Sequence, residues 1–89
     1  MEEKIDKNRV GVVGIIIESR EKLAPKVNEL LTGYGDVIVG RMGIPYHKRG
    51  VNVITLIVDG TTNEIGAMTG KLGMIEGVTV KSVMAKESE

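Results

Sequence analysis

Residues 51–83, VNVITLIVDGTTNEIGAMTGKLGMIEGVTVKSV, contain the pattern that decides the fold. The β-branched run at 51–58 predicts a strand, and Asp59-Gly60 predicts the turn that ends it. A second β-branched run at 78–83, after Gly77, predicts the last strand. The residues between the two runs have helical spacing, so the whole stretch predicts a strand-helix-strand unit.

The helix of this unit is indicated by its first turn and by one apolar stripe. Thr61 and Glu64 form the capping-box pattern, in which each side chain accepts a hydrogen bond from the other residue's backbone amide. The apolar stripe consists of Ile65, Met68 and Leu72. Gly66 and Gly70 lie beside it, where each costs about 1 kcal/mol relative to Ala. We therefore expect another helix or a second subunit to approach them closely, with a ligand groove as the alternative. Gly73 is expected to cap the helix.

The first half of the chain repeats this order of elements. It indicates a strand at 10–17, a helix at 22–31 that Gly33 ends, and a strand at 36–46, with a hairpin at 45–50. Because strand-helix-strand crossovers are right-handed, two such units predict an α+β sandwich of the ferredoxin-like βαββαβ type. We expect an antiparallel sheet in the order 4-1-3-2, with both helices on one face.

The length and the charged ends predict a single domain. We assign residues 9–85 to this domain, and we assign residues 1–8 and 86–89 to flexible tails because these ends are charged and lack a hydrophobic pattern.

The two central strands are apolar on both faces. The strand at 10–17 has Val10, Val12 and Ile16 on one face and Val13, Ile15 and Ile17 on the other. The strand at 51–58 has Val51, Val53 and Ile57 opposed by Ile54, Leu56 and Val58. Two helices cover only one face of a sheet, and an exposed apolar patch usually marks an interface. We therefore expect a homodimer or homotetramer in which the second face is buried. Gly11 and Gly14 inside the first strand are expected to admit a helix or a partner's backbone.

The composition argues against several classes of function. The 89 residues include 12 Lys and Arg and 12 Asp and Glu, whereas a nucleic-acid surface needs an excess of clustered positive charge. The chain has no Cys, which excludes disulfides and thiolate metal sites, and it has neither Phe nor Trp to stack on bases. The charged start, MEEKIDKNR, lacks the apolar segment of a signal peptide, and no apolar run approaches the ~20 residues of a membrane helix. We expect a cytoplasmic protein without direct contact to nucleic acid or membrane.

Candidate ligand-binding residues gather at one end of the predicted sheet. In this topology the end of the first strand, the middle hairpin and the loop at 74–77 meet there. We select five residues at or near this end: Glu18, Arg20, Arg41, Tyr46 and His47. Together with the amino end of the first helix they predict a site for a small polar or anionic ligand.

Two alternatives for these candidates stay open. The stretch at 46–49 is also typical of a solvated hairpin tip. Arg41 lies inside a strand, where a covered charge needs a partner, so it suits a structural ion pair as well, for example with Glu18.

Catalysis and metal binding lack the necessary groups. His47 is the single His, so Ser19 and Ser82 have no further His to act as a base. One His without Cys does not form a transition-metal site within one chain, although an oligomer can bring several copies of His47 together. We therefore predict no catalytic residue, no metal site and no cofactor. Turnover that depends on His47 would be needed to indicate a small enzyme.

Three blocks of the sequence resemble a known family: residues 37–45, VIVGRMGIP, residues 56–67, LIVDGTTNEIGA, and residues 69–73, TGKLG. The resemblance is to small proteins described as iron-only hydrogenase system regulators, and it extends from about residue 9 to residue 83. It implies an ACT-like, ferredoxin-like fold related to the ligand-binding domain of the nickel-responsive repressor. It also implies oligomerisation and a regulatory role in the iron-only hydrogenase system. In ACT domains ligands lie near the first strand-helix loop at a subunit interface, which corresponds to residues 18–20.

The chain departs from the nickel-responsive repressor in two respects. Residues 41–50 hold His47 and no Cys, so the nickel site is not carried over. Residues 1–8 are too short for the repressor's DNA-binding segment, so we expect a partner protein to connect such a regulator to DNA. Two hypotheses follow. The chain is either a ligand-sensing regulatory domain or a non-catalytic module that docks on a hydrogenase-related or maturation protein.

Overall fold

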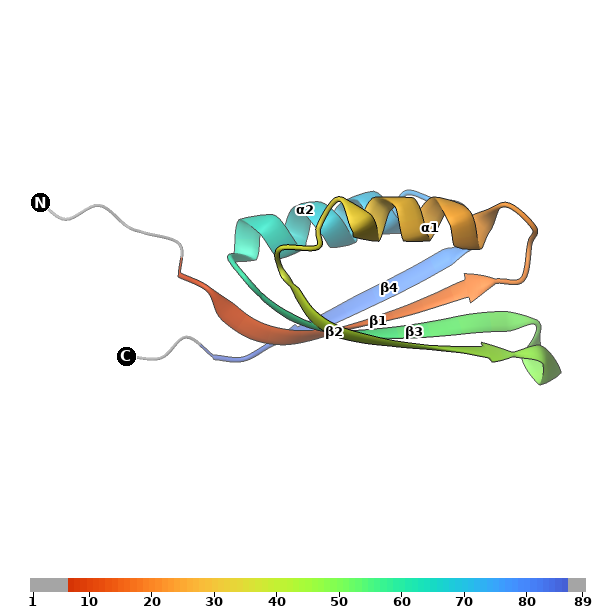
Figure 1. Ribbon diagram of the computed structural model, residues 1–89, viewed down its shortest axis with the longest axis horizontal. Coiled ribbons are helices and arrows are strands. Elements are labelled where there is room, and N and C mark those ends of the chain that lie inside the picture. Colours follow the sequence, from red (N-terminus) through yellow and green to blue (C-terminus); the bar gives the residue numbers. More distant parts are fainter. Residues whose placement is uncertain (1–6, 87–89) are drawn as a thin grey trace, which may run out of the picture.

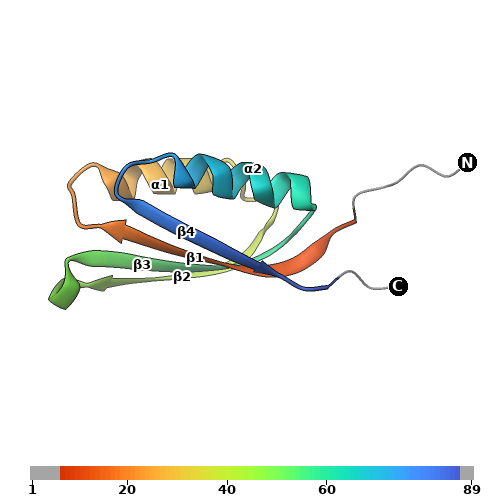
Figure 2. The same ribbon diagram turned by 180° about the vertical axis from the view of Figure 1, so that it is seen from behind.

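Residues 7–86 are described in the computed structural model of the chain, and they form four strands, two α-helices and a short 3₁₀ helix. In chain order these are β1 (Arg9–Glu18), α1 (Leu23–Thr32), β2 (Ile38–Tyr46), η1 (His47–Arg49), β3 (Val51–Gly60), α2 (Thr62–Gly73) and β4 (Val78–Met84). Neighbouring strands pair antiparallel in the order β2-β3-β1-β4, and both helices cover the same face (Figure 1 and Figure 2). The predicted ferredoxin-like fold is confirmed, since 4-1-3-2 is this sheet read from its other edge. Of the predicted tails, residues 1–6 and 87–89 lie outside the described residues.

The capping box predicted for α2 is present. The Thr61 amide donates to Glu64 Oε1 at 2.9 Å, and the Glu64 amide donates to Thr61 Oγ1 at 3.1 Å. Two amides that the helix itself cannot satisfy are thereby bonded, which fixes the start of α2 directly after β3.

Two boundary predictions based on glycine are wrong. Asp59-Gly60 does not turn the chain, because β3 continues through both residues and pairs them with Val10 and Arg9 of β1. Gly73 does not cap α2 but is its last residue, and the amide of Met74 bonds the final helical carbonyls. In both places regular hydrogen bonding continues through a residue type that often interrupts it.

The core lies between the helices and one face of the sheet. It consists of alternate residues of β1 and β3, the inner stripes of both helices and Val37 before β2: Val13, Ile15, Ile17, Ile54, Leu56, Val58, Leu23, Val27, Leu31, Ile65, Met68, Leu72 and Val37. The intervening apolar residues of the same strands point away from the helices and are about half exposed: Val10, Val12, Ile16 and Ile57. We call this second side of the sheet the open face. The two central strands are therefore apolar on both faces, a pattern typical of sheets that are covered on both sides.

The glycines of β1 and α2 differ in what surrounds them. A Cβ at Gly11 would collide with the Met84 side chain, so the close neighbour of this glycine is β4 of its own fold. Gly66 and Gly70 are exposed, and apart from the chain neighbours and the surrounding helix backbone no atom of the described residues lies within 4 Å of a Cβ built at either position. The expected approach of a helix within the fold is therefore wrong, and contact with a second subunit there stays a prediction.

Replacing Gly70 by Ala is expected to stabilise the isolated fold by about 1 kcal/mol, because Ala has the higher helix propensity and its Cβ meets no neighbour. For a domain of this size the melting temperature should rise by roughly 4–8 °C, as measured by scanning calorimetry. Gly66→Ala provides a second test on the same helix. A lower melting temperature with a smaller assembly mass would instead indicate that a second subunit packs on these glycines.

Candidate ligand-binding site

Three segments that are distant in the sequence meet at one end of the sheet (Figure 2). The Glu18 amide donates to the Gly77 carbonyl oxygen at 2.9 Å, and the Ser19 amide donates to the Gly50 carbonyl oxygen at 2.9 Å. The end of β1 is thereby bonded both to the loop before β4 and to the hairpin that follows β2. We call residues 18–20, 46–50 and 74–77 the charged end, and the topology brings them together as predicted.

An exposed ion pair lies at the charged end. Arg20 donates from Nη2 to Glu18 Oε1 at 2.6 Å and from Nε to the same oxygen at 3.0 Å. The hydrogen bond and the charge of Glu18 raise the pKa of Arg20, and the charge of Glu76 adds to this effect. These effects favour the charged form of a guanidinium that is already a cation under ordinary conditions. Because exposed ion pairs contribute little to stability, an incoming anion can replace the Glu18 carboxylate.

The amino end of α1 adjoins this ion pair. Its capping residue, Lys22, makes no side-chain hydrogen bond to the helix, and no acidic residue lies in the first turn. Leu23, the first helical residue, packs beside Gly77, so the helix begins directly next to the charged end. The amide of Leu23 already donates to the Arg20 carbonyl oxygen at 3.1 Å, and Pro25 has no amide hydrogen. The helix dipole and the remaining amides of the first turn still favour negative charge, which adds to the attraction that Arg20 exerts on an anion.

Tyr46 and His47 occupy the hairpin side of the charged end. Tyr46 pairs with Val51 of β3, and Val51 pairs with Glu18 of β1, so these three residues form one row across the open face. Tyr46 is 45% exposed and His47 begins the exposed η1 helix. Tyr46 therefore borders both the charged end and the apolar part of the open face.

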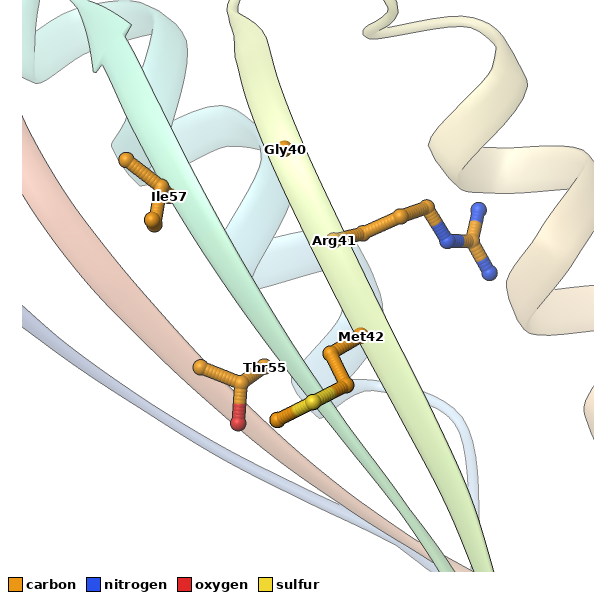
Figure 3. A pocket seen from close by; sticks show the side chains of 5 residues that line it. All are labelled: Gly40, Arg41, Met42, Thr55 and Ile57. Carbon is orange, nitrogen blue, oxygen red and sulfur yellow. The ribbon is translucent and has the colours of Figure 1, made fainter.

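A β-bulge decides where Arg41 lies. The register between β2 and β3 shifts between Ile38 and Gly40, so that Ile38 and Arg41 both face the helices. Uninterrupted alternation along β2 would place Arg41 on the open face. Its Nη2 instead donates to Asn28 Oδ1 at 2.7 Å, and Figure 3 shows the side chain extending towards α1.

The structure therefore brings four of the five predicted residues to one end of the sheet and separates the fifth. Glu18 and Arg20 are in direct contact, and Tyr46 and His47 lie on the adjoining hairpin. Arg41 is on the opposite side of the sheet, and the suggested ion pair with Glu18 is wrong because each residue has a different partner.

A hollow on the open face was not anticipated from the sequence. It has a volume of about 290 Å³ and is lined by Gly40, Met42, Thr55 and Ile57. Arg41 also borders it, but the Arg41 side chain extends away towards α1, as Figure 3 shows. The lining of the hollow is almost entirely apolar. The residue in the sequence that could have indicated this hollow is Gly40, because a glycine within a strand leaves space beside its neighbours on the same face.

Metal ligands do not cluster in residues 7–86, where no group of three or more His, Cys, Asp or Glu side chains could hold an ion. Within the same residues, neither α-helix is long and apolar enough to cross a membrane.

The fold is ACT-like, that is, a small α+β fold with two helices on one face of a four-stranded antiparallel sheet. Within this class, the chain belongs to the TM1266-like family, described as iron-only hydrogenase system regulators, whose family model matches residues 9–82. A search of curated proteins finds no match to this chain.

Solved structures agree with this assignment. The chain is 39% identical to the uncharacterized protein TM1266 from Thermotoga maritima, with a TM-score of 0.87 over 90% of this chain and 100% of that chain. It is 18% identical to the ACT domain of GTP pyrophosphokinase from Chlorobium tepidum, with a TM-score of 0.73 over 86% of this chain and 100% of that chain. A solution structure of the same domain gives 18% identity and a TM-score of 0.71 over 92% of this chain and 93% of that one. At this low identity the two ACT structures establish the fold alone.

Proposed function

We propose that this chain is a ligand-sensing, self-associating regulatory domain of the iron-only hydrogenase system, non-catalytic and located in the cytoplasm. The observation that carries the proposal is the exposed Arg20 guanidinium, held beside the uncapped start of α1. Membership of a family described as regulators supports the regulatory role. The ligand is a small polar or anionic molecule, because the cation and the helix start both favour negative charge.

Each candidate residue has a distinct part in this proposal. Arg20 binds the anionic group after Glu18 releases it, and Glu18 then accepts a hydrogen bond from a polar or cationic group of the same ligand. Tyr46 and His47 border the ligand from the hairpin. Arg41 acts from the other side of the sheet by holding α1 in place through Asn28.

Arg20→Ala should abolish the rise in melting temperature that the ligand causes, while the melting temperature without ligand changes little because the side chain is exposed. The measurement is a thermal-shift screen of wild-type protein against free amino acids, phosphate and small carboxylates, repeated with the variant. Arg49→Ala, a charge change on η1 at the same end, is the matched control and should respond as the wild type does. An unchanged response of Arg20→Ala would contradict the proposed site.

The alternative is a module that docks on a hydrogenase-related or maturation protein. The observation that favours it is Met74, an apolar side chain that is 85% exposed in the loop after α2. In that case no small molecule in the screen would shift the melting temperature of the wild type. Arg41→Ala would weaken the capture of a partner protein, although neither the wild type nor the variant responds to a ligand.

A further inference from the structure

β4 is an edge strand whose outer backbone groups have no strand to pair with in residues 7–86. It pairs with β1 alone, and the amide of Ala85 donates to the Val10 carbonyl oxygen at 2.8 Å. Because the backbone groups of an antiparallel strand point alternately to its two sides, residues 79, 81 and 83 bond β1 in the same way. The amides and carbonyls of the intervening residues therefore point outwards from the sheet: Val80, Ser82 and Met84.

β2, the edge strand on the other side of the sheet, is interrupted at both ends. The same alternation directs the outer backbone groups of this strand outwards from Arg41, Gly43 and Pro45. Pro45 has no amide hydrogen to donate, and the bulge between Ile38 and Gly40 breaks the regular spacing at the start of the strand. Prolines and bulges are features that keep a sheet edge from pairing with another strand. β4 contains neither, so it is the edge that is open to a further strand.

The space beside β4 is also accessible on the side of the helices. α2 lies over β4, as Figure 2 shows, and a Cβ at Gly73 would lie 3.5 Å from Cγ1 of Val80. Residues at intervals of four and three share one side of a helix. On α2 the side that includes Gly73 carries only small residues: Thr62, Gly66, Thr69 and Gly73. Apolar side chains of an added strand can therefore pack between this side of α2 and the partly buried Val80 and Met84.

We propose that β4 binds an extended segment of a partner protein, which adds a fifth strand to the sheet. In this mode of recognition main-chain hydrogen bonds provide the affinity and alternate side chains provide the specificity. The partner segment has apolar residues that face α2 and polar residues that face the open side, with an acidic residue opposite Lys81. The proposal goes beyond the ligand site at the charged end and does not rest on it.

The charge of Lys81 selects a partner protein over a second copy of this chain. Lys81 is the central residue of β4, and no carboxylate of residues 7–86 forms an ion pair with it. If the β4 strands of two copies paired along their full length about a two-fold axis, each Lys81 would lie directly opposite the other. Like charges in directly opposite positions destabilise a strand pair, whereas opposite charges stabilise it. An acidic residue of a partner segment therefore fits this position, and a second Lys81 does not.

The test uses a synthetic peptide, VTVEVTV, which matches the seven residues of β4 in length and places its Glu opposite Lys81. NMR spectra of the full chain measure the affinity and the hydrogen exchange of single amides. Binding should slow exchange at Val80, Ser82 and Met84 and leave Gly43 on the β2 edge unchanged. The same peptide, N-methylated at the amides that face β4, keeps every side chain. It should bind at least about tenfold more weakly, because the hydrogen bonds between the strands are lost.

Ser82→Pro removes one outer amide from β4. An edge strand tolerates proline where the amide does not bond its neighbour, so the fold should be retained while peptide binding weakens at least about tenfold. Ser82→Ala keeps the amide and is the matched control. Lys81→Glu is an independent variant on an exposed side chain. It should reverse the charge preference, so that the peptide VTVKVTV binds about fivefold more tightly than VTVEVTV.

Three outcomes would contradict the proposal. Unchanged exchange at Val80, Ser82 and Met84 in an excess of peptide would show that the edge does not accept a strand. Equal binding of the N-methylated peptide, or wild-type affinity in a folded Ser82→Pro variant, would show that the peptide binds elsewhere. An assembly of two chains that Ser82→Pro dissociates would show that β4 pairs with a second copy, which would overturn the choice of a partner protein.

Discussion

Leu56→Ala is expected to lower the free energy of unfolding by about 2–5 kcal/mol, whereas Ile57→Ala should cost the single copy at most about 1 kcal/mol. The two residues are neighbours in β3, but Leu56 is fully buried under the helices and Ile57 is 48% exposed on the open face. Removing the Leu56 side chain leaves a cavity in a core without Phe or Trp. Since domains of this kind are stable by only about 5–15 kcal/mol, this variant should lose much of its stability.

Urea unfolding at two protein concentrations measures both effects. The decrease in the free energy of unfolding caused by Leu56→Ala should be the same at both protein concentrations, because the cavity lies within one copy. The loss caused by Ile57→Ala should grow with concentration if a second copy covers this residue, because assembly stabilises the wild type by mass action. Equal losses for the two variants at low concentration would contradict the description of one buried and one open face.

The fold could be predicted from the sequence because its signals are local or periodic. Thr61 and Glu64 specify the start of α2 through bonds between residues three positions apart. Alternation along β1 and β3 places the correct residues in the core, since a change of one position would move each of them to the other face. The turn predicted at Asp59-Gly60 is wrong because a contact distant in the sequence decides the structure there. Pairing with β1 outweighs the local turn preference of the two residues.

The candidate site could be predicted only in part. The charged end follows from topology, which the sequence determines well, and the Glu18–Arg20 pair joins residues two positions apart. The position of Arg41 depends on the bulge between Ile38 and Gly40, which no local pattern indicates. Its partner Asn28 lies 13 positions away on a helix, so only the three-dimensional structure could identify the contact.

Tyr46 connects the two surfaces to which function has been attributed. It lies in the row of Glu18 at the charged end and also belongs to the open face, where it is about half exposed. A second copy on the open face would therefore border the ligand site. Binding of the ligand would then change the affinity for the second copy, and docking of the second copy would change the affinity for the ligand. Under the proposed function, such coupling would let a small domain convert ligand binding into a change of assembly.

Gly77→Ala is the second substitution from which we expect a large effect. It should lower the free energy of unfolding and also disturb the geometry of the charged end. Gly77 has a φ of 91°, a conformation that costs other residues roughly 1–3 kcal/mol. A Cβ there would lie 2.7 Å from Cδ1 of Leu23, a buried core residue, which adds roughly 1–3 kcal/mol of overpacking. The same Cβ would lie 3.5 Å from Cζ of Arg20.

Gly50→Ala is the matched control for this substitution. Gly50 also has a positive φ, 66°, but a Cβ there meets nothing within 4 Å, so only strain of about 1–2 kcal/mol is expected. Urea unfolding should therefore rank Gly77→Ala as clearly less stable than Gly50→Ala. In the thermal-shift screen Gly77→Ala should also weaken the response to anions, because relief of the collision moves Leu23, the first residue of α1, away from the charged end. Equal destabilisation by both substitutions, with an unchanged anion response, would show that the charged end tolerates this movement and that its geometry does not depend on Gly77.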